Sequence, residues 1–135
     1  MFDWYYTIKR KIKQFSIYNI IYGIKNLVKW FPIIWKDRDF DEGYLYDIMY
    51  FKLGEMQKFF ESDNVWCANT DECVKQLKEC RMLLKRIMND ETEYECWDHD
   101  NKKFTKPLEE ISKLVKEEKE LFWSKMCKYV DGWWD

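Results

Sequence analysis

The most unusual polar chemistry of the chain lies between residues 37 and 41, where Asp37, Asp39 and Asp41 alternate with other side chains around Arg38. Alternating carboxylates in a loop can hold a divalent cation, and an Arg oriented by carboxylates can bind an anionic ligand. A calcium loop of the EF-hand type needs glycine at its sixth position and an acid at its twelfth, and neither occurs when counting from Asp37. Two interpretations stay open: the acids cap the next helix and fasten Arg38, or Arg38 is held ready for a ligand.

Aromatic and basic residues near this corner indicate what such a ligand would be. Aromatic residues make up 19% of the chain, above ordinary usage. Flat rings stack on nucleobases, although they also pack in cores and in dimer interfaces. A guanidinium, nearby lysines and stacked rings would together suit a small anionic, base-bearing ligand such as a nucleotide second messenger. The residues predicted to bind it are Lys25, Lys29, Trp35, Asp37, Arg38, Asp39, Asp41 and Tyr44.

The remaining polar residues favour no catalytic or metal-binding role. The one histidine, His99, lies between Asp98 and Asp100 and would need a distant ligand to complete a metal site. No glycine pattern of a nucleophile elbow or a phosphate-binding loop occurs. Acids near the carboxyl end are similar to those of all-helical nucleotide pyrophosphohydrolases, but interleaved lysines favour ordinary ion pairs (Glu109, Glu110, Glu117, Glu118 and Glu120). We therefore expect no enzyme, no metal and no cofactor, with metal-dependent nucleotide hydrolysis as the weakest alternative.

Length and composition bound the class of protein. A chain of 135 residues suits one compact domain, and a net charge of −2 argues against binding to a long nucleic acid. Five cysteines without a CxxC spacing indicate buried free thiols in a reducing compartment. The sequence shows no signal peptide and no run of roughly 18 uncharged apolar residues, so we expect no membrane span and a cytoplasmic location.

Helices must position all these residues, because four Gly and two Pro leave few breakers for a many-stranded sheet. Residues 4 to 15 predict a basic amphipathic helix, and a second segment from Ser16 should end near Trp30 because Pro32 follows. Asp39 or Asp41 would cap a helix whose apolar positions run from Leu45 to Phe60.

Two further helices follow along the chain. Asn69 or Thr70 would cap a helix with an apolar stripe through Met88, and residues 89 to 103 read as an exposed loop. Pro107 would open a last helix, which Gly132 would stop. The prediction is an all-α fold, a single domain over residues 1–135 built as a bundle of four to five antiparallel helices.

A family resemblance rests on three features: the segment WFPIIWKDRDFDEGYLYDIMYFKLGEM, a later helix rich in Cys and Leu, and the terminal GWWD. In these the chain resembles a group of small uncharacterised bacteriophage proteins. The resemblance implies a viral origin and the host cytoplasm, and it brings no known activity. By analogy, small phage proteins without enzymatic motifs often act by binding, including the sequestration of host defence components.

Two functions are therefore expected, from different classes. The first is a non-enzymatic binding protein that captures a nucleotide-like ligand through Arg38 in the manner of a sponge. The second is a protein-interaction module or homo-oligomer whose exposed aromatic residues bury against another chain.

Overall fold

The computed structural model describes residues 17–38, 41, 43–62 and 69–134 and divides the chain into two compact units, Met1–Asp41 and Glu42–Asp135. Within the described residues the fold is helical, with five α-helices and one two-stranded sheet, which confirms the all-α prediction. The helix expected over residues 4 to 15 and the Ser16 cap lie outside the described residues. The expectation of one domain over residues 1–135 stays a prediction.

The first unit contributes one described helix, α2 (Ile17–Ile34). The expectation that Pro32 ends this helix near Trp30 is wrong, because Pro32 lies inside it. A proline removes one backbone donor, but the carbonyls on either side of it accept hydrogen bonds from later residues: Phe31 O accepts from Trp35 N at 2.9 Å and Ile33 O from Lys36 N at 3.2 Å. The helix therefore continues past Pro32.

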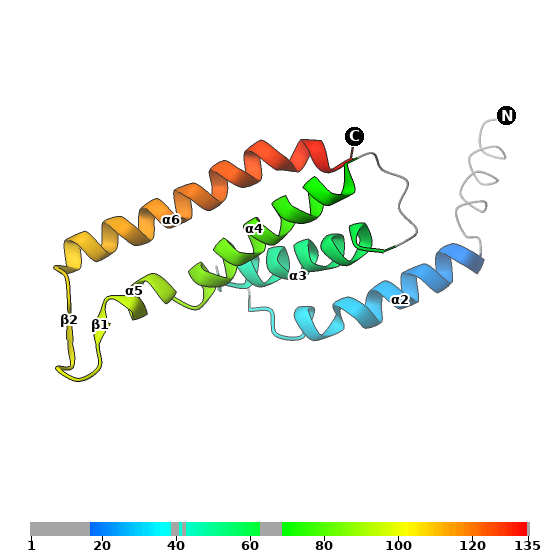
Figure 1. Cartoon of the computed structure of the whole chain (residues 1–135). Helices are drawn as coiled ribbons and strands as arrows, with labels where there is room; N and C mark the ends of the chain where they lie inside the picture. Colours follow the sequence, from blue (N-terminus) through cyan, green and yellow to red (C-terminus); the bar gives the residue numbers. More distant parts are fainter. Residues whose placement is uncertain (1–16, 39–40, 42, 63–68, 135) are drawn as a thin grey trace, which may run out of the picture. The chain divides into compact units, whose positions relative to one another are not determined.

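The second unit is built around three long helices, α3 (Gly43–Phe60), α4 (Thr70–Met88) and α6 (Leu108–Tyr129). They run alternately up and down, and α4 packs against both α3 and α6 (Figure 1). The repeat of apolar residues every three or four positions gives each helix one inward face. The core comprises Leu53, Met56, Phe60, Cys73, Leu77, Cys80, Leu83, Leu84, Ile87, Phe122 and Trp133.

Trp133 closes one end of this core from the 3-10 helix η1 (Val130–Trp134), which follows α6 directly. Its side chain is 2% exposed, and its indole Nε1 donates to Gln76 Oε1 of α4 at 3.1 Å. Gly132 does not stop α6 as expected. It lies within η1, and no described glycine has a positive φ, so the chain turns tightly without a left-handed cap.

Residues 89 to 103, expected to be an exposed loop, are ordered structure instead. A short helix, α5 (Glu91–Glu95), is followed by a hairpin of β1 (Trp97–Asp98) and β2 (Lys103–Phe104), with Trp97 opposite Phe104. Asp98 Oδ1 accepts from the backbone N–H groups of Asp100 and Asn101, each at 3.0 Å, which fixes the turn. These elements are too short for any periodicity, and tertiary contacts hold them.

The cysteines expected as buried thiols are buried at Cys73, Cys80 and Cys96, while Cys127 is exposed. All four are free thiols, and Cys67 lies outside the described residues. Burial raises the pKa of the Cys80 thiol to about 11, so this thiol stays protonated near neutral pH. Among the described helices, none is long and apolar enough to cross a membrane.

Candidate functional site

The acidic corner is exposed on the first unit. Asp37, Arg38 and Asp41 lie on the surface, and Arg38 Nη1 donates to the backbone carbonyl of Asp37 at 2.8 Å. Asp41 N in turn donates to Arg38 O at 2.8 Å. Arg38 is thus fastened to its own loop through a main-chain carbonyl, and the expected contact with an Asp carboxylate stays a prediction because Asp39 lies outside the described residues.

The other predicted ligand-binding residues fall on both units. Lys25, Lys29 and Trp35 lie in or just after α2, where Trp35 is 73% exposed and contacts the Phe31 ring at a centroid separation of 5.2 Å. Lys25 Nζ lies 5.7 Å from the centre of the Tyr22 ring. Tyr44 belongs to the second unit and is half-buried, and Asp39 lies outside the described residues. Whether these residues form a ligand site stays a prediction.

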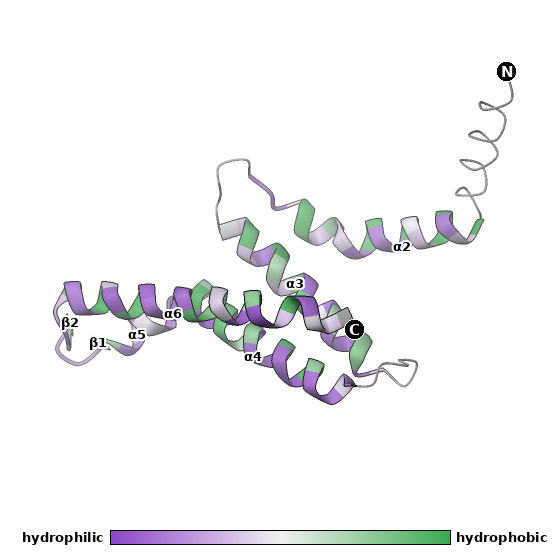
Figure 2. Ribbon diagram, turned by 90° about the horizontal axis from the view of Figure 1, so that it is seen from above, coloured by the Kyte–Doolittle hydropathy of each residue, from purple (hydrophilic) through white to green (hydrophobic). Residues whose placement is uncertain are grey.

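Many of the exposed large apolar side chains lie on α2. None of its side chains is buried, although hydrophobic bands recur along its length between hydrophilic ones (Figure 2). Six of the apolar side chains recur at alternating steps of three and four, which is the spacing of a and d positions in a coiled coil: Ile17, Ile20, Ile24, Leu27, Phe31 and Ile34. Leu27 is 68% exposed. A continuous uncovered stripe of this kind is typical of an interface.

A second apolar surface lies within the Glu42–Asp135 unit, between α3 and α6. It is a groove of about 540 Å³ lined by Leu45, Tyr46, Ile48, Met49, Lys119 and Trp123. Leu45 was expected on the inward face of its helix but is 63% exposed. Apolar surface therefore remains at the rim of the core.

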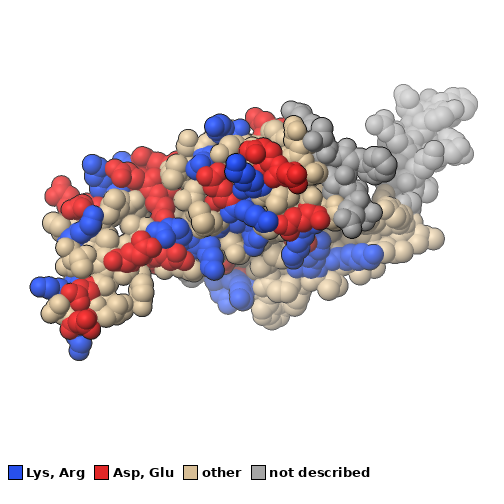
Figure 3. All heavy atoms as spheres, in the orientation of Figure 1, with Lys and Arg blue, Asp and Glu red and all other residues tan. Residues whose placement is uncertain are grey.

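The acids of α6 are engaged with cations. Lys106 pairs with Glu110 at 2.6 Å, and Lys113 and Lys116 each approach an acid four residues later at 3.8 Å. Lysines and acids mix over this face of the unit (Figure 3). Among the described residues, no group of three or more His, Cys, Asp or Glu side chains is arranged to hold a metal ion.

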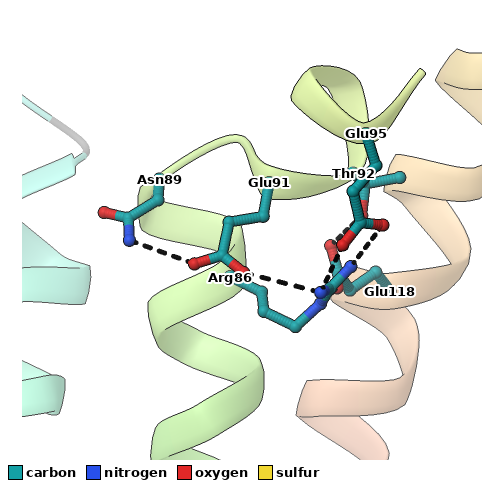
Figure 4. A network of polar contacts seen from close by, with 6 residues as sticks. All are labelled: Arg86, Asn89, Glu91, Thr92, Glu95 and Glu118. Atoms are coloured by element: carbon teal, nitrogen blue, oxygen red, sulfur yellow. Dashed lines mark hydrogen bonds and ion pairs between the residues drawn. The ribbon is translucent and has the colours of Figure 1, made fainter. Parts of the chain in front are cut away.

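Arg86 of α4 organises the strongest polar cluster of the second unit (Figure 4). Its Nε donates to Glu118 Oε1 of α6 at 2.7 Å, and Nη1 and Nη2 donate to the two carboxylate oxygens of Glu95 at 2.8 and 3.1 Å. The Thr92 hydroxyl donates to Glu118 Oε2 at 2.6 Å. These bonds to Glu95 and Glu118 raise the pKa of Arg86 and fasten α5 to both long helices.

A second arginine, Arg81, lies against the backbone of α3 at Gly54. A Cβ atom on Gly54 would come within 3.2 Å of Arg81 Nη2. The guanidinium carbon lies 4.6 Å from the centre of the Tyr50 ring, and Nη1 donates to Gln57 Oε1 at 2.7 Å. Sequence reasoning missed both arginines. Glu95, nine residues after Arg86, is too far along the chain for helical pairing, so no spacing rule could indicate that contact.

Comparisons with known proteins identify no relative of this chain. No protein-family model matches the chain, and neither the curated proteins nor the solved structures that were searched contain a match.

Proposed function

We propose that this protein is a helical interaction module whose contact surface is the apolar stripe of α2, and that the stripe binds the same stripe on further copies of the chain. One observation carries the proposal: an 18-residue helix with apolar side chains at every a and d position and no buried residue. Exposed apolar side chains on this scale are costly in water, and burial against another chain removes the cost.

The charge pattern supports a second copy over a different protein. Charged side chains at the e and g positions normally select the partner of a coiled coil. In α2 these positions hold only uncharged residues, namely Ile21, Gly23, Val28 and Trp30. Lys25 and Lys29 lie at the outward b and f positions, so stripes can meet without bringing the lysines together. Identical stripes are therefore compatible.

The residue types of the stripe also indicate how many copies of the chain assemble. Isoleucine at both a and d positions favours three or four strands over two. Apolar residues at e, namely Ile21 and Val28, widen the stripe in the same direction. At 1.5 Å per residue α2 is only about 27 Å long, so we expect a reversible assembly that forms at raised protein concentration.

The test is light scattering coupled to size exclusion over a wide range of protein concentration. We expect the wild-type mass to rise towards a trimer or tetramer. Leu27→Lys should weaken the assembly strongly, because each buried Leu contributes about 1.5–3 kcal/mol. Asn26→Lys is the matched control, since it adds the same charge beside Leu27 at an exposed position off the stripe. A wild-type protein that stays monomeric at every concentration would contradict the proposal.

A further inference from the structure

A hollow lined by three aromatic rings lies where α5 meets the β-hairpin. It has a volume of about 240 Å³ and is lined by Asn89, Asp90, Glu93, Tyr94, Trp97 and Phe104. Trp97 and Phe104 face each other across the two strands, with ring centroids 4.9 Å apart and planes at 78°. Because these two rings are nearly perpendicular, they form two walls of a corner. Tyr94 supplies the third ring from α5.

The hollow is held in shape from several sides. The Arg86 cluster fastens α5, which carries Glu93 and Tyr94. The Tyr94 ring also contacts the His99 ring at a centroid separation of 5.0 Å. Thr105 extends the hairpin, with its backbone N–H donating to Cys96 O at 2.8 Å. Asp90 adopts a left-handed conformation with φ of 50°, which turns the chain between α4 and α5.

The electrostatics of the hollow are those of a cation site. Residues 89 to 103 carry two lysines, Lys102 and Lys103, against six acids: Asp90, Glu91, Glu93, Glu95, Asp98 and Asp100. Arg86 pairs with Glu91 and Glu95, and Asn101 bonds to Asp98. By contrast, no described residue makes a hydrogen bond or ion pair with the carboxylate of Asp90 or Glu93. The two lining acids therefore keep their charge available.

We propose that this hollow binds a methylated ammonium group, with Tyr94, Trp97 and Phe104 as the ring walls and Asp90 and Glu93 as the counter-charges. Aromatic faces attract cations through their quadrupoles, and rings set at steep angles surround quaternary ammonium groups in known cages. A plain lysine ammonium fits less well, because it is strongly hydrated and loses more on leaving water. The site belongs to the Glu42–Asp135 unit and α2 to the other unit, and the proposed binding uses none of the residues of the α2 stripe.

The test is a titration of the intact protein with tetramethylammonium chloride, followed by NMR at constant ionic strength. We expect saturable shifts confined to residues 89–105. Because the hollow is open and cation–π contacts at exposed sites are weak, the expected Kd is on the order of 1 mM. Ammonium chloride should bind at least about tenfold more weakly, since it retains its water more strongly.

Two sets of variants separate the rings from the charges. Tyr94→Ala should abolish the saturable shifts, because it removes one wall. Glu93→Gln keeps the shape and removes one charge, and it should weaken binding about threefold to tenfold. Glu109→Gln is the matched control for the charge: Glu109 is exposed, lies on α6 and lines no part of this hollow. Its Kd should equal that of the wild type.

Further ligands in the same titration identify which kind of molecule carries the methylated ammonium group. Choline represents free small molecules, and a peptide carrying trimethyllysine represents a modified protein. Tighter binding of either supports the proposal and names the source. A neutral isostere of choline, 3,3-dimethylbutan-1-ol, tests the charge. Equal shifts with this alcohol, or no saturable shift with tetramethylammonium, would overturn the assignment.

Discussion

Replacing Arg86 with Met should destabilise the second unit by removing the cluster that joins α4, α5 and α6. The Arg86 side chain is 29% exposed and makes its shortest bond, 2.7 Å, to Glu118, whose side chain is 13% exposed. A hydrogen bond to a partly buried charged group contributes about 1.5–3 kcal/mol to stability. The pair with Glu95 adds little, because that side chain is 60% exposed and water screens the charges.

The expected loss is therefore about 2 kcal/mol in the free energy of unfolding, most of it from the Glu118 contact. Urea denaturation followed by circular dichroism measures this loss, and the slope against urea should not change. In a unit of this size, such a loss should lower Tm by roughly 10 °C. The Thr92 hydroxyl would still bond to Glu118, which limits the penalty for an unpaired carboxylate.

A double variant tests the physical reason. Arg86→Met with Glu118→Met removes both charges, so no carboxylate is left partly buried without its cation, and at least half of the lost stability should return. Glu95→Gln, at the exposed end of the cluster, should leave the urea midpoint unchanged within error. If Arg86→Met costs less than about 0.5 kcal/mol, the ascribed role of the cluster is refuted.

Two other predictions concern pH and ligand. The Lys125 ammonium, with help from the Tyr129 hydroxyl, lowers the pKa of Glu79 below its usual 4.5. A depressed carboxyl pKa adds stability above the unfolded value, and this stability is lost as pH falls through the folded value, so Glu79→Gln should flatten the decline of unfolding free energy below about pH 5. If the corner binds a nucleotide, a panel of cyclic and linear nucleotides should raise Tm, and Arg38→Ala should abolish the rise while Lys36→Ala should not. Failure of every nucleotide to raise Tm would count against the ligand role of Arg38.

The sequence predicted those parts of the fold in which apolar residues recur regularly, every three or four positions, over several turns. In α4 the spacing of Cys73, Leu77, Cys80, Leu84 and Ile87 places them on one face, and all five are buried. Such a stripe is specified locally, because only one side of the helix can face the core. Its expected start is also right, although the side chain at the cap position, Asn69, makes no capping bond.

The parts that were mispredicted depend on contacts between distant residues. Residues 89 to 103 read as a loop because their acids show no period, yet Arg86 and Glu118 hold α5 in place. Gly54 gave no local sign that Arg81 lies against it. For the candidate sites, the sequence drew attention to Arg38, whose ligand role stays a prediction, and to the aromatic excess. It could not assign Tyr94, Trp97 and Phe104 to one hollow. The pairing of β1 with β2 places Trp97 beside Phe104, and the packing of α5 against the hairpin adds Tyr94. Neither contact follows from a repeat in the sequence.

The Trp133 indole has a consequence for how the protein is made. The indole completes the core, and the residue that accepts its hydrogen bond, Gln76, precedes it by 57 positions. On the ribosome, α3 and α4 emerge and can pair early, but one end of their core stays open until η1 has been synthesised. During that interval the nascent chain presents apolar surface to chaperones and proteases. We therefore expect chains that terminate before Val130 to be degraded in cells even though every long helix is present.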